Sequence, residues 1–565
     1  MVDLRSKIFG LAGALLCTGM AYAAPATCTA PTTTTVVIRA EGTTEQLAPV
    51  TWTCTITAGA ATPSAAGIAI QDFLSPAIPA TSKLLSAASG ATEANIVITC
   101  APCATVPTGT STISGVISGS TINFNGTLPG LTPSAAVPPV TPPYATGDVL
   151  TFVMTNVRVN ATSLSVGSGL PPSISETIFV SGAAVVPAAL AAVTTGFAQN
   201  GLGASTLNKS FAIGGAGFPF GTTGAFSGAN SFVICNTYRP SLGNALATVV
   251  TVKENFSSAF KTAGAAGASA PGNEASQTVA PISTNTTPSG TRVNVNFANV
   301  PANVTVYVPS GAILSQGLST ASISLTSAGA GSAFAAVSAG TSSTLAGLAL
   351  AAVTIASGTG TATFEVLVSD PTNLDTFNIP VYIVTTANTV PGSATAMTIN
   401  VSLAPVGSTA FPNFAVGANT TTLTASSFSL CTTSLMFPFV TNQLGFDTGI
   451  AVANTSTDPF GGLGATPQAG TCSLNFYGNG APTPNNVTTP NVPSGTVYTT
   501  TLSSVAAGFQ GYVIAQCQFQ YAHAFVFVTN GVGPNGGLSQ GYLAGVILDT
   551  NQVGRPAGFG ETLGQ

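Results

Sequence analysis

The sequence predicts an all-β fold made of several tandem β-sandwich (Ig-like) domains with disulfides. Apolar and polar residues alternate with a period of two wherever a pattern is clear, which is typical of strands with one buried face. The 62 glycines and 38 prolines supply frequent turns between such strands. Helical periodicity is nearly absent: residues 183–198 suit a short helix, but Pro187 interrupts them.

Individual strands can be placed along the chain from this alternation. In residues 50–57, four apolar residues alternate with four threonines, which predicts a half-buried strand with hydroxyls on its outer face. Residues 115–125 predict a hairpin with Gly119-Ser120 at the turn. Further alternating strands are expected at residues 96–100, 292–297, 304–308, 361–368 and 377–384.

The first 23 residues predict an export signal. Arg5 and Lys7 give a positively charged start, and residues 8–20 are apolar. Ala21-Tyr22-Ala23 then has the small-x-small pattern of a cleavage site. We therefore expect residues 1–23 to be a signal peptide that is removed from the mature protein.

The rest of the sequence indicates a secreted, cell-surface-associated protein. Leu16 stands where a lipoprotein signal has a small residue, which disfavours lipidation of Cys17. The most apolar run after the signal, residues 345–356, is too short for a membrane-spanning helix. No transmembrane segment is therefore expected after signal removal.

The cysteines predict a set of disulfides. Removal of the signal leaves eight of the nine cysteines, and an even number in an exported chain favours disulfides. The C-x-x-C at Cys100 and Cys103 suits a redox pair, half of a zinc site or a local disulfide. No second C-x-x-C or H-x-x-H completes a zinc site, so the disulfide is favoured. The expected pairs are Cys28–Cys54, Cys100–Cys103, Cys472–Cys517 and, as a fourth, Cys235–Cys431, with Cys431 a competitor for Cys517.

The mature length corresponds to roughly three or four domains. Three segments rich in small residues and proline mark a loop in the first domain and two connectors, at residues 128–147, 262–290 and 413–427. The expected division is a β-sandwich domain at 24–168, a β-rich domain at 169–285, an Ig-like β-sandwich domain at 286–425 and a C-terminal β-sandwich domain at 426–565.

The low charge excludes several classes of function. Only 5% of the residues are Asp, Glu, Lys or Arg, against about 25% in an ordinary soluble domain. Nucleic-acid binding needs basic patches, and most enzymes need positioned acids and bases, which this chain scarcely has. We expect no catalytic residue, no cofactor and no metal. An uncharged surface also tolerates close self-packing, and few carboxylates predict a weak dependence of stability on pH.

Several polar residues are candidates for a functional site. If residues 513–529 form one strand, His523 shares a face with aromatic residues, which favours a packed core histidine over a catalytic one. Asp370 and Asp375 lie between two strands and are interpreted as turn residues, with a weak calcium loop as the alternative. Asp447 and Asp458 flank a short strand and are interpreted in the same way.

The last domain and several upstream segments carry a family resemblance. Residues 431–449, 470–478 and 509–523 resemble a group of large, mostly uncharacterised secreted and surface β-rich proteins of soil bacteria. Residues 39–45 and 254–261 resemble the same group. The resemblance implies a surface protein and supplies no catalytic residue.

These observations predict a non-enzymatic exported structural or adhesive protein of the bacterial cell surface or extracellular matrix. It would act by self-association or adhesion, so its partner is another copy of itself or a surface polysaccharide. The alternative is an extracellular polysaccharide-binding protein, followed by a secreted hydrolase. Exposed aromatic residues beside amides favour glycan binding, and exposed apolar strands favour assembly.

Overall fold

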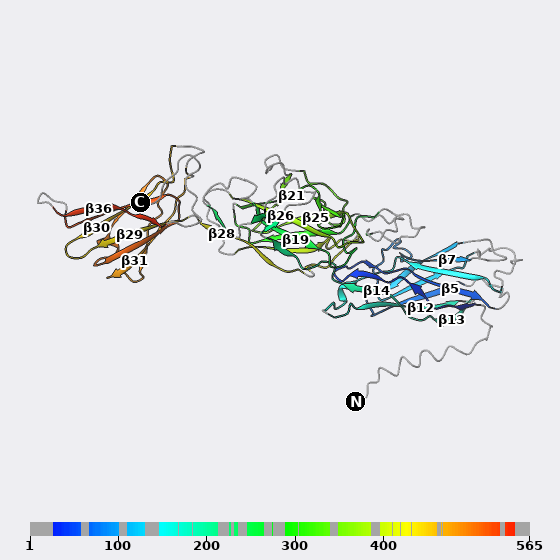
Figure 1. Ribbon diagram of the computed structural model, residues 1–565. Helices are drawn as coiled ribbons and strands as arrows, with labels where there is room; N and C mark the ends of the chain where they lie inside the picture. Colours follow the sequence, from blue (N-terminus) through cyan, green and yellow to red (C-terminus); the bar gives the residue numbers. More distant parts are fainter. Residues whose placement is uncertain are drawn as a thin grey trace, which may run out of the picture.

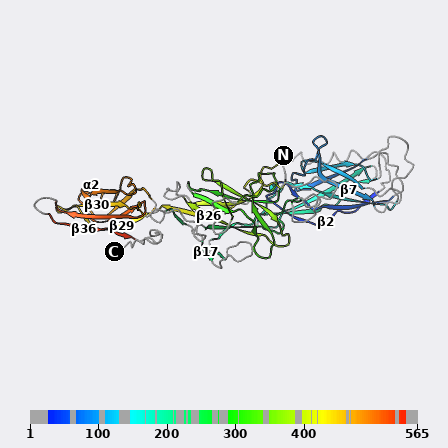
Figure 2. The same ribbon diagram turned by 90° about the horizontal axis from the view of Figure 1, so that it is seen from above.

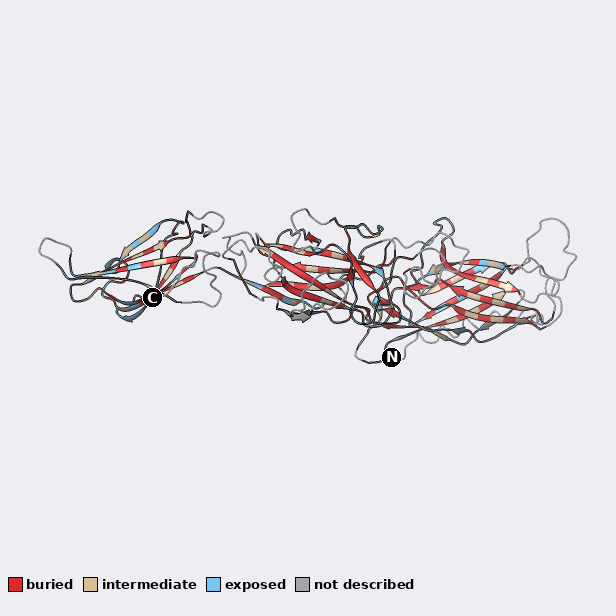
Figure 3. Cartoon of the chain, turned by 45° about the horizontal axis from the view of Figure 1, so that its top comes forward, coloured by how far each residue is buried: buried red, intermediate tan, exposed pale blue. Residues whose placement is uncertain are grey.

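Three clusters of buried apolar side chains divide the chain into three β units that lie in a row (Figures 1 and 2). The first unit lies within residues 26–199, the second within 202–430 and the third within 433–547. Figure 3 shows buried residues running along the strands of each unit. The computed structural model describes residues 26–57, 67–100, 110–129, 146–167, 169–182, 185–208, 210–212, 225–227, 231–234, 246–264, 274, 289–302, 304–338, 349–385, 396–408, 411–417, 420–430, 432–459, 465, 467–531 and 537–547.

The first unit is one sheet of twelve strands around a single core. The sheet curls, because β2 near one end of the strand order contacts β14 near the other end. Trp52 stacks on Phe152 inside it, with ring centroids 5.1 Å apart. The strands, in sheet order, are β1 (Ala26–Cys28), β5 (Val50–Ile56), β10 (Val149–Thr155), β7 (Ala91–Cys100), β8 (Thr110–Ser118), β9 (Thr121–Gly126), β6 (Ile68–Ser75), β12 (Ser173–Gly182), β14 (Val193–Gln199) and β3 (Val36–Arg39), with β2 (Thr32–Thr33) on β5 and β13 (Val185–Ala189) on β12. A separate pair, β4 (Glu45–Gln46) and β11 (Arg158–Val159), and the short 3-10 helix η1 (Ala161–Ser163) complete the unit.

The second unit is a β-sandwich, because the residues of two sheets share one core. Its five-stranded sheet contains β15 (Thr206–Asn208), β19 (Leu246–Lys253), β26 (Thr376–Thr385), β21 (Val304–Pro309) and β24 (Leu350–Ala352). Its seven-stranded sheet contains β18 (Ser231–Ile234), β28 (Leu423–Leu430), β27 (Met397–Ala404), β20 (Arg292–Ala298), β25 (Gly360–Val368), β23 (Ser322–Leu325) and β22 (Ile313–Leu314). A hairpin of β16 (Ser210–Ala212) and β17 (Ala225–Ser227) stands apart from both sheets.

The third unit is a smaller β-sandwich that follows β28 directly. Its five-stranded sheet contains β32 (Asn486–Thr488), β31 (Cys472–Asn479), β34 (Gln510–Cys517), β29 (Thr433–Thr441) and β37 (Gly545–Ile547). Its four-stranded sheet contains β33 (Val497–Thr501), β30 (Asp447–Asn454), β35 (Ala522–Thr529) and β36 (Ser539–Leu543), and the single turn of helix α2 (Leu502–Val505) follows β33.

The all-β prediction and the individual strands are confirmed. The strands expected at 50–57, 292–297, 304–308, 361–368 and 377–384 correspond to β5, β20, β21, β25 and β26. The predicted hairpin is β8 and β9, which pair as far as Ser118 and Thr121 across Gly119-Ser120. Gly119 has a φ of 65°, which explains why glycine stands at this turn.

The division into domains differs from the expected one. Strands β12, β13 and β14 belong to the first sheet, so the boundary expected at 168/169 falls inside the first unit. The short helix suggested at 183–198 is also wrong, since these residues include β13 and β14. The linker expected at 413–427 runs into β28, which pairs with β27 and β18. Most of the segments 128–147 and 262–290 lies outside the described residues.

Candidate functional site

Most of the charged side chains that the structure describes are buried. Burying a charge is costly unless it is paired, so each of these groups either needs a partner or must be neutral. The surface is left with few charges, among them the exposed Lys83 and Lys253. The buried charged residues are Arg39, Glu41, Glu45, Asp72, Glu93, Asp148, Arg158, Glu176, Glu254, Glu274, Arg292, Glu365 and Asp375.

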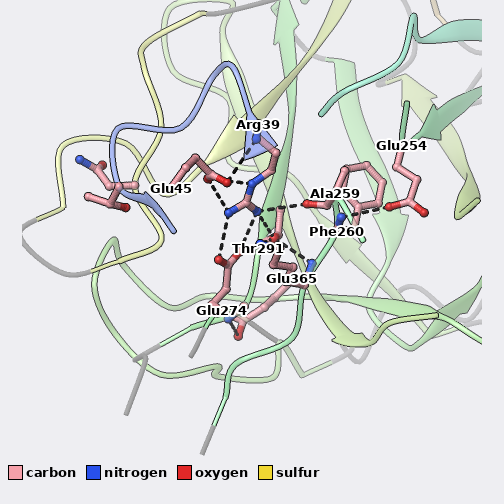
Figure 4. A network of polar contacts seen from close by, with 12 residues as sticks. Arg39, Glu45, Glu254, Ala259, Phe260, Glu274, Thr291 and Glu365 are labelled. Atoms are coloured by element: carbon pink, nitrogen blue, oxygen red, sulfur yellow. Dashed lines mark hydrogen bonds and ion pairs between the residues drawn. The ribbon is translucent and has the colours of Figure 1, made fainter. Parts of the chain in front are cut away.

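Arg39 is the centre of a buried charge cluster that joins the first unit to the second (Figure 4). Its Nε donates to Glu45 at 2.8 Å, and its two terminal nitrogens donate to the two carboxylate oxygens of Glu274 at 2.8 and 2.9 Å. One terminal nitrogen also donates to Thr291 Oγ1 at 2.8 Å and to the carbonyl of Ala259 at 3.1 Å. Arg39 and Glu45 come from the first unit and the other three residues from the second, so one guanidinium links the two units.

Arg158 extends the cluster. Its Nε donates to Glu93 at 3.0 Å, and one terminal nitrogen donates to the backbone carbonyl of Glu274 at 3.3 Å. Its guanidinium carbon lies 3.9 Å from the centre of the Phe411 ring, and that of Arg39 lies 4.8 Å from the centre of the Phe414 ring. Both phenylalanines belong to the β27–β28 connection of the second unit, so cation–π contacts add to the ion pairs across the joint.

The electrostatics of the joint favour the charged forms. Burial opposes the charge of Arg39, but the carboxylates of Glu274 and Glu45 outweigh it and raise the pKa of the guanidinium. Burial likewise opposes the charge of Glu274, but Arg39 outweighs it and lowers the pKa of that carboxyl. The joint therefore holds an ion pair that is saturated with hydrogen bonds, an arrangement suited to fixing two units rather than to proton transfer.

Backbone contacts reinforce the joint. The carboxylate of Glu41 accepts from the backbone N–H groups of Gly201 and Leu202 at 2.8 and 3.1 Å, where the chain passes from the first unit to the second. The N–H of Thr43 donates to the carbonyl of Asn413 at 2.9 Å. These contacts fix the segment between the units as well as their facing loops.

Two buried pairs of side chains each consist of two carboxyl groups, with no basic side chain as a member of the pair. Asp72 on β6 and Glu176 on β12 face the core of the first unit from neighbouring strands, and their carboxyl oxygens lack a hydrogen-bond partner within the described residues. Burial raises the pKa of Asp72 to about 8, and burial with the neighbouring Asp72 raises that of Glu176 well above its usual value. Burial therefore favours the neutral form of both carboxyl groups.

The second pair, Glu254 and Asp375, lies in the second unit. The backbone N–H of Asp375 donates to Glu254 at 2.9 Å, and the N–H of Phe260 donates to it at 3.0 Å. Burial raises the pKa of Glu254 to about 8 and that of Asp375 to about 6. Burial again outweighs the hydrogen bonds and favours the neutral form of both carboxyl groups.

The third unit exposes many large apolar side chains. An open groove of about 690 Å³ lies between the start of the β29–β30 loop and strand β36, and Phe439, Leu444, Phe446 and Leu538 line it. On the outer face of the five-stranded sheet, Tyr477 and Tyr512 stack with ring centroids 5.0 Å apart. The exposed large apolar residues of this unit are Met436, Phe439, Leu444, Tyr477, Val497, Tyr512, Phe525, Phe527, Leu538, Leu543 and Ile547.

The predicted position of His523 in the core is wrong. Residues 513–529 are two strands, β34 and β35, separated by a turn at 518–521 in which Tyr521 has a φ of 58°. The turn shifts the alternation, so that Ala522, Ala524 and Val526 face the core. His523 therefore lies on the outer face of β35 and is only partly buried.

The structure brings two of the predicted cysteine pairs together. Disulfides join Cys28 to Cys54, which face each other on β1 and β5, and Cys472 to Cys517, which face each other on β31 and β34. Cys100 is also disulfide-bonded. Its predicted partner Cys103, and both members of the predicted pair Cys235–Cys431, lie outside the described residues.

The aspartates considered as candidate sites accept hydrogen bonds from other residues of the chain. Asp370 accepts from the backbone N–H of Thr372 at 3.1 Å and from Asn373 Nδ2 at 3.0 Å, as expected of a turn residue. Asp447 accepts from Asn442 Nδ2 at 3.0 Å. Within the described ranges, no group of three or more His, Cys, Asp or Glu residues is arranged to hold a metal ion. No helix in the described part of the chain is long and apolar enough to cross a membrane.

The buried charge cluster was not predicted from the sequence. The signal that points to it is the spacing of the rare charges, because Arg39, Glu41 and Glu45 fall within seven residues of a chain with 5% charged residues. The partner Glu274 stands in a connector and is isolated in the sequence. Its role follows only from the tertiary fold.

Comparisons with known proteins give distant structural similarity. No protein-family model and no curated protein matches the chain. The major pilin subunit of Bacillus cereus is 9% identical with a TM-score of 0.19, covering 82% of this chain and 93% of that chain. The T6 backbone pilin of Streptococcus pyogenes serotype M6 is 8% identical with a TM-score of 0.20, covering 84% and 79%. The N-terminal region of an enterococcal surface protein is 10% identical with a TM-score of 0.17, covering 72% and 94%. At these TM-scores the similarity assigns no family and no function to the chain.

Proposed function

We propose that the chain is a non-enzymatic exported structural or adhesive protein of the bacterial cell surface or extracellular matrix, acting by self-association or adhesion. The signal-like N-terminus and the disulfides support export. The row of three β units, with a buried ion-pair joint between the first two, supports a structural role. A second candidate function, binding of extracellular polysaccharide, is favoured by the exposed phenylalanines of β35.

The main observation behind this proposal is that Leu444 is exposed and has a left-handed backbone conformation. Its side chain is 93% exposed, and its φ of 54° lies in the left-handed region. Glycine or asparagine would be more stable there, because a branched apolar side chain is disfavoured at positive φ. Folding thus gains nothing from leucine at this position. A contact with another molecule would account for it.

The surroundings of Leu444 support self-association. The groove of about 690 Å³ beside it is lined mainly by apolar and amide side chains. Within the described residues of the third unit, the charged side chains are Asp447 and Asp458, so two copies approach without strong repulsion. Exposed contiguous apolar surface of this kind marks contact sites in soluble proteins.

The test compares Leu444→Asn with the matched control Leu318→Asn, whose leucine is also exposed but lies in the second unit. The mature protein and both variants are examined by sedimentation and by electron microscopy over a range of concentrations. We expect the native protein and Leu318→Asn to form clusters or fibres. Leu444→Asn should remain monomeric, with a thermal unfolding temperature that is not lowered. A native protein that is monomeric at every concentration contradicts self-association. Turnover of a polysaccharide, ester or peptide substrate contradicts the non-enzymatic assignment.

A further inference from the structure

A shallow groove of about 450 Å³ runs along strand β30 on the outer face of the four-stranded sheet of the third unit. Its floor is low because the outward residues of β30 are small. The neighbouring strands provide two walls, one bearing phenylalanine rings and the other bearing threonines. The floor contains Gly449 and Ala451, the aromatic wall Phe525 and Phe527 of β35, and the hydroxyl wall Thr499 and Thr501 of β33.

No structural requirement explains why glycine stands at position 449. Its backbone does not lie in the left-handed region, and an added Cβ would meet only the carbonyl oxygen of Phe527, at 3.8 Å. A β-branched residue favours a strand and glycine weakens one, so glycine costs stability here. The absence of a side chain keeps the floor of the groove empty.

The walls have the chemistry of a site for uncharged sugars. Phe525 and Phe527 are 44% and 38% exposed, so part of each side chain is available to apolar C–H faces, while the tip of the Phe525 ring lies over Gly541 of β36. Thr499, on the opposite wall, carries a hydroxyl that can donate and accept hydrogen bonds. The Thr501 hydroxyl already donates to Ser504 Oγ at 3.1 Å and accepts from Ser503 Oγ at 3.2 Å. Asp447, at one end of the floor strand, already accepts hydrogen bonds from Asn442 and Ser503. The lining itself contains no charged residue, which favours a neutral ligand.

The groove is unsuited to a peptide strand. β30 pairs with β33 on one side and with β35 on the other, so its backbone groups are already hydrogen-bonded. A peptide that adds to a sheet needs a free strand edge, which this floor does not offer. The wall strands are roughly 10 Å apart, from about 4.8 Å per strand, so the groove suits an extended polymer that uses side-chain contacts.

We propose that this groove binds a neutral polysaccharide, with its sugar rings against Phe525 and Phe527 and its hydroxyls toward Thr499. This inference rests on the second candidate function, the binding of extracellular polysaccharide. It names the class of ligand and a surface separate from Leu444. Neutral sugar chains combine apolar ring faces with hydroxyl edges, which matches the two walls.

The first variant fills the floor of the groove and leaves the residues of the walls unchanged. Gly449→Val places a β-branched side chain into the groove, and the matched control Gly545→Val adds the same side chain on the other sheet, where nothing lies within 4 Å. A second variant, Phe527→Ala, removes one ring of the wall. Binding to cello-, malto- and chito-hexaose, with alginate as the anionic comparison, is measured by calorimetry, and thermal unfolding checks the fold.

We expect the native protein and Gly545→Val to bind at least one neutral hexaose. Gly449→Val and Phe527→Ala should each lose affinity by about tenfold or more while remaining folded. Failure of the native protein to bind any neutral hexaose overturns the inference, as does full affinity in a folded Gly449→Val protein or preferential binding of alginate. If Leu444-dependent assembly persists in that case, the sugar site is wrong and the structural role stands.

Discussion

Glu274 receives two hydrogen bonds from the guanidinium of Arg39, at 2.8 and 2.9 Å, although the two residues are 235 positions apart in the chain. Their contact places the ion pair between the first and second units, where both side chains are almost fully buried. Within the part of the chain that the structure describes, most of the few charged side chains thus lie in the interior. The described surface consists mainly of hydroxyl, amide and apolar groups.

Loss of Arg39 should destabilise the joint strongly. Arg39→Met leaves the carboxylates of Glu45 and Glu274 buried without their guanidinium, and breaking a buried pair typically costs about 3–5 kcal/mol. Denaturant unfolding measures the loss. The control is Lys253→Met, at an exposed lysine, which should change the free energy of unfolding by less than about 0.5 kcal/mol. Equal effects of the two substitutions would contradict a structural role for the joint.

The stability of the first unit should fall as pH rises from about 4 to 8. The pKa of Asp72 is raised in the folded state to about 8, so the native protein binds more protons than the unfolded chain between the two pKa values. For each such proton, the free energy of unfolding falls by about 1.4 kcal/mol per pH unit as the pH increases. The burial of these carboxyl groups therefore predicts a stronger pH dependence than their small number alone does.

Asp72→Asn tests this pH dependence. The amide has nearly the same shape and cannot ionise, so the decline in Tm between pH 4 and pH 8 should be smaller in the variant than in the native protein. Asp370→Asn, at a turn, serves as the control and should leave the decline in place, because the pKa of Asp370 is lowered by its hydrogen bonds. A native Tm that is constant over this range would refute the prediction.

The disulfide between Cys472 and Cys517 should stabilise the third unit. It joins two neighbouring strands over a separation of 45 residues, and both cysteines are buried in the core. Replacing both with alanine should lower the free energy of unfolding of this unit by about 2–5 kcal/mol. Differential scanning calorimetry of the double variant should show a lower transition for this unit only. An unshifted transition would mean that the bond is dispensable.

Replacing His523 should affect folding less than replacing its inward neighbour. His523 lies on the outer face of β35, whereas Val526 is fully buried in the core. Val526→Ala removes two buried methyl groups and leaves a cavity, which should cost about 1.5 kcal/mol or more. We expect a smaller loss for His523→Ala in the same denaturant measurement. A larger loss for His523→Ala would restore the core assignment.

The sequence by itself determined the class of the fold and the positions of many strands, because the period-two alternation of β5, β20 or β25 is a local property of the chain. It also determined the turn at Gly119, since only a few residues adopt that backbone conformation. The low charge and the even number of cysteines are likewise properties of the sequence alone.

Only the tertiary structure decided which strands share a sheet, where the charges lie and which way His523 faces. β12 pairs with β6, although about a hundred residues separate them in the sequence. The local periodicity of a strand does not indicate which distant strand it pairs with. Glu274 becomes a partner of Arg39 only when two units meet. For His523, the left-handed Tyr521 in the preceding turn shifts the alternation by reversing which residues face the core. The turn before a strand thus sets which of its residues face the core. The alternation of apolar and polar residues alone does not predict such a turn.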